Sequence, residues 1–144
     1  MYIEKITLCE YVNENFEAVN AKKVFCSADS SVQVLVQLNE IQQDTIIKFN
    51  WYKSHNDKEQ IIGIYEIPII GKKNISPRYA IAGFDIPLLM EEEPNGFSEK
   101  WGVLIELNGD VESMNFEFKK YKNYDKELKS NIQITPSSTL DWKA

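Results

Sequence analysis

Apolar and polar residues alternate along much of this chain, and this period of two constrains its fold more than any other feature. Residues 31–38 (SVQVLVQL) and 45–53 (TIIKFNWYK) show the alternation most clearly. Successive side chains of an extended backbone point to opposite sides, so the pattern is typical of a strand with one buried side. Both segments are rich in β-branched and aromatic residues, which sheets favour. The residues on the predicted core side are Val32, Val34, Val36 and Leu38, then Ile47, Phe49 and Trp51.

Two later segments extend the pattern. Residues 61–70 offer four residues for burial, namely Ile62, Ile64, Tyr65 and Ile67. Pro68 cannot donate a hydrogen bond to a neighbouring strand, so we expect this strand to lie at a sheet edge or to end there. Residues 78–89 predict a further strand, with their better core side at Ala80, Ala82, Phe84 and Ile86. The intervening polar segments are predicted turns and loops: residues 54–60, 71–77 and 90–100.

Residues 101–118 (WGVLIELNGDVESMNFEF) predict a β-hairpin. Asn108-Gly109 is the strongest short-range signal for a two-residue turn, because both central positions need a positive φ. Such a turn predicts the cross-strand pairs Leu107 with Asp110, Ile105 with Glu112, Val103 with Met114 and Trp101 with Phe116. The last two pairs are apolar on one face, as cross-strand packing requires, so the register is well specified.

The two ends of the chain carry weaker signals. Residues 2–12 predict an opening strand, residues 21–28 a short strand containing Val24 and Cys26, and residues 13–23 a helical turn. Beyond Phe118 the composition turns polar, and a short helix or a frayed continuation of the last strand would both fit. We therefore divide the chain into a sandwich domain at 1–120 and a C-terminal extension at 121–144, partly docked or mobile.

Together these segments predict an all-β fold: an antiparallel two-sheet sandwich of about seven to eight strands. The alternating VQVLVQL, the following IIKFNWYK and the late WGVLIELNGDVESMNFEF resemble bacterial immunoglobulin-like and fibronectin type III-like domains. Trp51 lies where such domains place a buried tryptophan on their third strand. The resemblance implies an immunoglobulin-like scaffold that binds other macromolecules, and it implies no reaction.

The sequence departs from that family pattern in two places. The strands that carry paired cysteines in antibody domains have none here, and no tyrosine stands where the tyrosine corner is expected. Cys9 and Cys26 are the two cysteines of the chain, and their spacing leaves open whether they form a disulfide. These departures count against a relationship to antibody or receptor domains.

Composition narrows the range of partners. The net charge of −6 and pI of about 4.9 argue against nucleic acid, which needs a basic face to neutralise phosphates. No run approaches the roughly 20 apolar residues that span a bilayer. The first residues lack the pattern of a signal peptide, so we expect a cytoplasmic protein, or an extracellular or envelope protein if a leader has been removed. We expect a monomer or weak homodimer whose partner is another protein.

Residue types that carry chemistry are sparse. His55 is the only histidine and falls in a predicted turn, and the Glu91-Glu92-Glu93 run lacks the ligand spacing of a calcium loop. There is no glycine-rich phosphate loop and no nucleophile motif. The sequence therefore predicts no catalytic residue, no metal and no cofactor.

Three hypotheses of function follow. The first is a non-enzymatic protein-binding module, with Tyr52, His55 and Tyr65 as candidate contacts on its surface. The second is a carbohydrate- or ligand-binding accessory module that uses surface aromatics, and it requires a row of exposed Trp or Tyr rings. The third is an enzyme with a carboxylate-rich cleft, which requires paired carboxyl groups of raised pKa.

Overall fold

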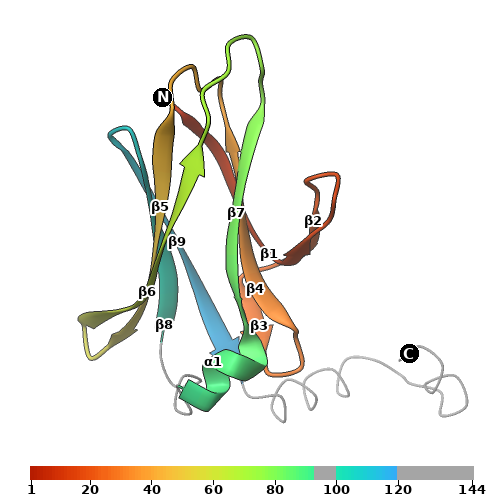
Figure 1. Cartoon of the computed structure of the whole chain (residues 1–144). Helices are drawn as coiled ribbons and strands as arrows, with labels where there is room; N and C mark the ends of the chain where they lie inside the picture. Colours follow the sequence, from red (N-terminus) through yellow and green to blue (C-terminus); the bar gives the residue numbers. More distant parts are fainter. Residues whose placement is uncertain (93–99, 120–144) are drawn as a thin grey trace, which may run out of the picture.

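The computed structural model describes residues 1–92 and 100–119 of the chain (Figure 1). This part contains nine strands and one short helix. The elements are β1 (Ile3–Val12), β2 (Ala18–Ala21), β3 (Val24–Cys26), β4 (Ser31–Leu38), β5 (Thr45–His55), β6 (Lys58–Ile69), β7 (Arg78–Asp85), α1 (Ile86–Glu92), β8 (Lys100–Leu107) and β9 (Asp110–Lys119). The predicted C-terminal extension and helix lie outside the described residues. No helix in the described ranges is long and apolar enough to cross a membrane.

The strands form two sheets that pack face to face. The four-stranded sheet has the order β2-β1-β4-β7, and the five-stranded sheet has the order β3-β9-β8-β5-β6. This arrangement confirms the predicted all-β two-sheet sandwich. Two details differ from the prediction: the described residues already supply nine strands, and β3 pairs with β9 in parallel. The parallel pair arises because the chain crosses from one sheet to the other between Ala21 and Val24.

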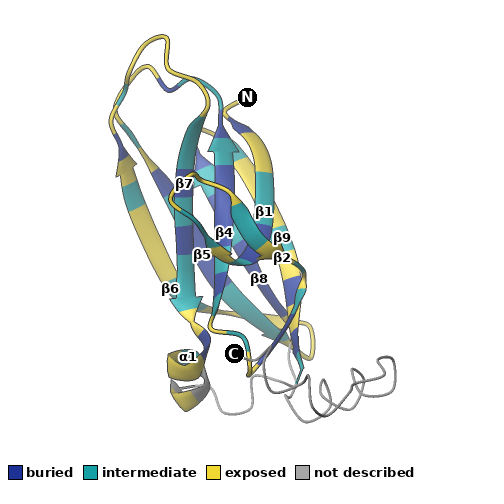
Figure 2. Cartoon of the chain, turned by 90° about the vertical axis from the view of Figure 1, so that its right-hand side faces the viewer, coloured by how far each residue is buried: buried dark blue, intermediate teal, exposed yellow. Residues whose placement is uncertain are grey.

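The core lies between the sheets, where the inward side chains of both meet (Figure 2). Every residue predicted on the core side of residues 31–38 and 45–53 is buried there. Trp51 and Trp101 are 2% and 1% exposed, and both pack against the ring of Phe116. Full burial of a large apolar side chain contributes about 1.5–3 kcal/mol, so these rings are principal sources of stability.

The predicted hairpin is confirmed in turn and register. Asn108 and Gly109 have φ angles of 47° and 90°, as a two-residue turn of this kind requires. Leu107 pairs with Asp110 and Trp101 pairs with Phe116, as expected from the sequence. The signal was reliable here because turn chemistry and apolar pairing favour the same register.

The connection between β5 and β6 is shorter than predicted. Only Asn56 and Asp57 form the turn, with φ angles of 52° and 63°, and the expected seven-residue turn was wrong. Asn and Asp adopt this left-handed conformation more readily than other residues with a side chain. His55 and Lys58 are therefore the last and first residues of paired strands.

Two other local predictions were wrong. Residues 13–23 hold strand β2 instead of a helical turn, because the Asn13 side chain accepts hydrogen bonds from the backbone N–H groups of Asn15 and Glu17 and turns the chain back. Glu91 and Glu92 belong to helix α1 instead of a loop. The Asp85 carboxylate caps this helix by accepting a hydrogen bond from the Leu88 N–H at 3.2 Å.

β6 is an edge strand, as Pro68 predicted. Its predicted buried face needs a correction at Ile64 and Tyr65, which are 52% and 45% exposed. An irregularity in the pairing opposite Trp51 and Tyr52 shifts the register, so Gly63 pairs with Trp51 and Ile64 with Asn50. Such a bulge exchanges the two faces of a strand. Ile64 therefore lies on the outer face of the sheet.

Candidate functional site

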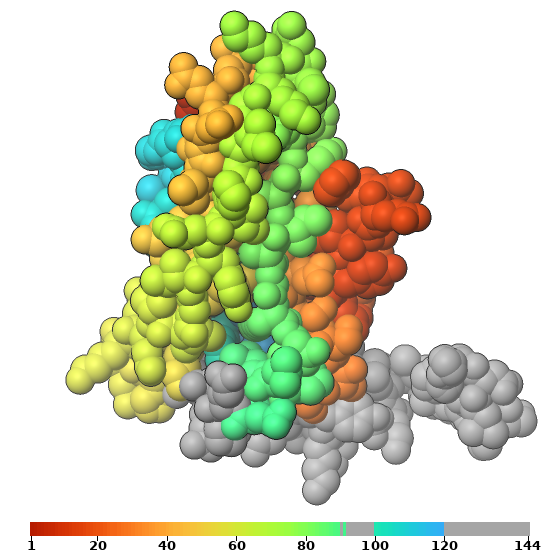
Figure 3. Space-filling view, viewed as in Figure 1, coloured from red at the N-terminus to blue at the C-terminus, as the bar shows by residue number. Residues whose placement is uncertain are grey.

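An apolar hollow lies where β6, β7 and α1 meet. Its volume is about 250 Å³. The two strands belong to different sheets and lie side by side on this face of the molecule, with α1 below them (Figure 3). We call the surface formed by β6, β7 and α1 the open side. The hollow is lined by Trp51, Ile62, Gly63, Tyr65, Phe84, Asp85, Leu88 and Leu89.

The hollow exists because the two sheets differ in width. Tyr65 pairs with Phe49, so its side chain lies on the inner face of the five-stranded sheet. It is nevertheless 45% exposed. In the described part of the chain no strand follows β7 in the four-stranded sheet, so nothing from that sheet lies across from Tyr65. The inner face of β6 is consequently left partly uncovered.

Trp51 forms the floor of this region. Its ring meets the ring of Phe84 edge-on, with 5.0 Å between centroids. Its Nε1 is buried and has no hydrogen-bond partner among the described residues.

Of the three predicted contact residues, the structure places one at the hollow. Tyr65 lines it, as described above. Tyr52 lies on the outer face of the five-stranded sheet, where its hydroxyl donates to Asn115 Oδ1 at 3.0 Å. A side chain at Gly102 would meet the Tyr52 ring within 2.5 Å, so Tyr52 packs on this glycine. His55 is exposed at the β5–β6 turn. The three residues therefore do not form one site.

Sequence reasoning missed Leu88 and the role of Phe84 in this hollow. Leu88 is 60% exposed on α1, which the prediction had left partly in a strand and partly in a loop. A signal for the helix was present: Asp85 directly before Ile86-Pro87 is a favourable start, since Asp is a preferred cap and proline fits the first turn. The apolar run Ile86–Leu89 concealed it.

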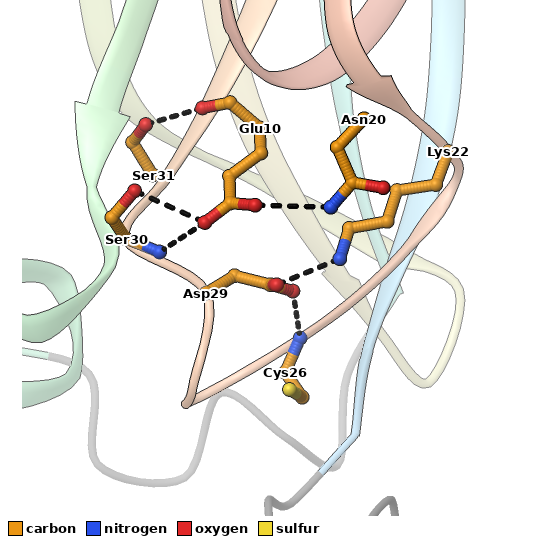
Figure 4. A network of polar contacts seen from close by, with 7 residues as sticks. All are labelled: Glu10, Asn20, Lys22, Cys26, Asp29, Ser30 and Ser31. Atoms are coloured by element: carbon orange, nitrogen blue, oxygen red, sulfur yellow. Dashed lines mark hydrogen bonds and ion pairs between the residues drawn. The ribbon is translucent and has the colours of Figure 1, made fainter. Parts of the chain in front are cut away.

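A second cluster is polar, and it fastens the crossing between the sheets (Figure 4). The Glu10 carboxylate accepts hydrogen bonds from Ser30 N–H and Asn20 Nδ2, both at 3.0 Å. These bonds hold the pKa of Glu10 below its ordinary value of 4.5. Nearby, Asp29 accepts from Lys22 Nζ at 2.7 Å and from the Cys26 N–H at 2.9 Å. The two carboxylates, of Glu10 and Asp29, already have hydrogen-bond partners, so we interpret this cluster as structural.

Asp110 also has a lowered pKa, because its carboxylate accepts from the backbone N–H groups of Ile3 and Tyr2. The clear shifts among described carboxyl groups, those of Glu10 and Asp110, are thus opposite to the shift that a general acid needs. No group of three or more His, Cys, Asp or Glu residues in the described ranges is arranged to hold a metal ion.

The two cysteines are free and buried, Cys9 in β1 and Cys26 in β3. Burial raises the pKa of both thiols, which lowers the fraction of reactive thiolate. These residues therefore belong to the packing of the sandwich.

The aromatic surface required by the carbohydrate hypothesis is weak in the described residues. Trp51 and Trp101 are buried, and Trp142 lies outside the described residues. Tyr52 packs on its own sheet, and Tyr65 stands at the edge of the hollow. No planar row of exposed Trp and Tyr rings is formed by these residues.

No protein-family profile matches this sequence, and no curated protein matches it significantly.

Proposed function

We propose that this protein is a non-enzymatic binding module that recognises another protein through the open side of its sandwich. The observation that carries the proposal is the hollow between β6, β7 and α1, with apolar side chains exposed around it. Tyr65 and Leu88, which line the hollow, are 45% and 60% exposed. Exposed apolar side chains next to a hollow are a common feature of protein-binding surfaces.

We also propose that the sandwich is of the immunoglobulin-like or fibronectin type III-like kind. Two features support this: Trp51 is buried in the core on a central strand, and neither sheet is a simple meander. Folds of this kind present loops and strand edges for recognition. The fold alone is compatible with many tasks, so the functional proposal depends on the open side.

The test is comparative capture from cells of the source organism. The full chain is immobilised beside two variants, Tyr65→Glu and Leu88→Glu, which place a charge at the rim of the hollow. We expect the wild-type chain to retain at least one partner, identified by mass spectrometry, and both variants to retain at least about tenfold less of it. Such a loss corresponds to about 1.4 kcal/mol, typical of a charge placed in an apolar contact.

Val111→Glu is the matched control. Val111 is an aliphatic residue of similar exposure, 55%, but it lies on β9. We expect the Val111→Glu variant to retain the partner as well as the wild-type chain does. Loss of the partner in all three variants, or in none, would contradict binding through the open side, and turnover of a substrate by the full chain would contradict the non-enzymatic part.

A further inference from the structure

The four edge strands of the two sheets are protected very unequally. β2 and β3 are short, with four and three residues. β6 is long, but it carries Lys58, Glu59 and Glu66, contains Pro68 and is interrupted by the bulge. Short length, charge, proline and bulges are the usual protection against pairing with another chain.

β7 has none of these protections along its length. Its eight residues, RYAIAGFD, pair with β4 on one side, and no described strand lies on the other. Charges occur at its two ends, Arg78 and Asp85, and the six residues between them are uncharged and contain no proline. β7 is therefore the one long, uncharged edge strand that the described residues leave unpaired.

Beside the unpaired edge of β7 is a space on the open side of the sandwich. It lies over the inner face of β6, where Tyr65 and Ile67 pair with the core residues Phe49 and Ile47. One boundary is formed by Arg78, whose Nη2 donates to the Ile70 carbonyl at 2.9 Å and so ties β7 to the chain after β6. The other boundary is α1, which follows β7 directly.

We propose that this space receives one extended, alternately apolar segment of a partner protein, which adds antiparallel to β7 as a fifth strand of the four-stranded sheet. The inference rests on the proposed function and names the form of the partner. Backbone hydrogen bonds to β7 supply affinity in this mode of recognition, and the inward side chains supply specificity.

A second copy of this chain is a poor occupant. Antiparallel pairing of two β7 strands is related by a twofold axis perpendicular to the sheet. Because β6 of the five-stranded sheet extends past β7, the β6 strands of the two copies would then overlap sterically. A single extended segment has no second layer and avoids this collision.

The chemistry of the site selects the segment. Inward side chains meet Ala80 and Ala82 along β7 and then the hollow near Phe84, so they must be apolar, and one of them can enter the hollow beside Trp51 and Leu88. An antiparallel segment begins near Asp85 and ends near Arg78. A basic first residue and an acidic last residue therefore complement the ends of β7.

The probe is a synthetic peptide of about eight residues, Lys-Val-Thr-Val-Thr-Val-Thr-Glu, which matches the length of β7 and places valines inward. Its control has the same composition with the two end residues exchanged. Each is titrated into the full chain, and amide hydrogen exchange is followed by NMR. We expect exchange to slow by about tenfold or more on saturation at those amides of residues 79–84 whose N–H groups point away from β4. We expect the first peptide to bind about threefold more tightly, as two exposed ion pairs allow.

Substitutions locate the peptide. Leu88→Glu is expected to weaken binding by about tenfold, and Val111→Glu to leave it unchanged. Thermal unfolding of both variants shows whether each is folded, and since both positions are exposed we expect both to be.

Other outcomes overturn the inference. Protection of β7 that appears without peptide and rises with protein concentration would assign the edge to a second copy. Protection without peptide at every concentration would assign it to residues of the same chain. Peptide binding that leaves residues 79–84 unprotected would place the peptide elsewhere, and so would a loss of affinity in Val111→Glu as large as that in Leu88→Glu.

If capture depends on Tyr65 and Leu88 while β7 remains unprotected, the proposed function stands and strand addition fails. If no partner is captured, the proposed function fails.

Discussion

The two sides of the sandwich differ in how the sheets are joined. On the side of β1, β2 and β3, the chain crosses between the sheets, and hydrogen bonds of Glu10 and Asp29 fasten the crossing (Figure 4). On the open side β6 and β7 lie next to each other without pairing, around a hollow lined mainly by apolar side chains. The first side uses its polar groups internally, whereas the second leaves a strand edge and apolar surface unused.

This difference shows where the molecule can accept a partner with least disruption. A ligand at the crossing would have to break hydrogen bonds between groups that already have partners, and a buried group left unpaired is costly. At the open side a ligand would cover exposed apolar surface and bond to backbone groups of β7 that no described strand pairs with. The predictions below test whether the two sides differ in stability as the structure indicates.

The largest expected contrast is between Phe25 and Tyr65. Phe25 lies fully buried on β3 and meets the rings of Phe116 and Phe118 at 5.8 and 6.4 Å. Phe25→Ala should lower the free energy of unfolding by about 3–5 kcal/mol, because it leaves a cavity. Tyr65→Ala, on the open side, should lower it by less than about 1 kcal/mol. Urea unfolding measures both, and similar losses would show that the open side is as tightly built as the crossing.

Asp29→Asn should have an intermediate effect. The substitution keeps the shape of the side chain but removes the ion pair to Lys22. The side chain of Asp29 is 12% exposed and that of Lys22 is 19% exposed. Hydrogen bonds to a charged group contribute more than neutral ones, so we expect a loss of about 1–2 kcal/mol in urea unfolding. Asp57→Asn is the control, because Asp57 is exposed in a turn that Asn adopts equally well. A stability of D29N equal to that of D57N would mean that the ion pair does not fasten the crossing.

Glu10→Gln should have the smallest effect, and the effect should depend on pH. The pKa of Glu10 is lower in the folded chain than its ordinary 4.5, so its carboxylate stabilises the fold above that value. This stabilisation is lost as the pH falls from 4.5 through the folded pKa. We expect E10Q to be less stable than wild type by about 0.5–1 kcal/mol at pH 7, discounted for solvent exposure, and equal to it in strong acid. The control is E14Q, at an exposed loop position, whose free energy of unfolding should equal that of wild type at every pH. A loss of stability in E10Q that does not depend on pH would refute the electrostatic explanation.

Much of the fold could be predicted because its signals are local. Alternation identified the buried faces of β4 and β5, and Asn108-Gly109 set the β8–β9 register. The candidate site was predicted only in part, since Tyr65 lies at the hollow while Tyr52 and His55 lie elsewhere. Ile64 was misplaced because a bulge depends on the neighbouring strand and leaves no mark in the period of its own segment.

The sequence by itself determined most of the extended segments, the core-facing residues of β4 and β5, and the chemistry of the tight hairpin turn, because these depend on residues close together in the chain. Only the tertiary structure decided that the chain crosses between sheets before β3, that β3 runs parallel to β9, and that one sheet is a strand wider than the other. The order of strands depends on contacts between residues far apart in sequence. The open side follows from that order, since it exists where the wider sheet extends past the edge of the narrower one.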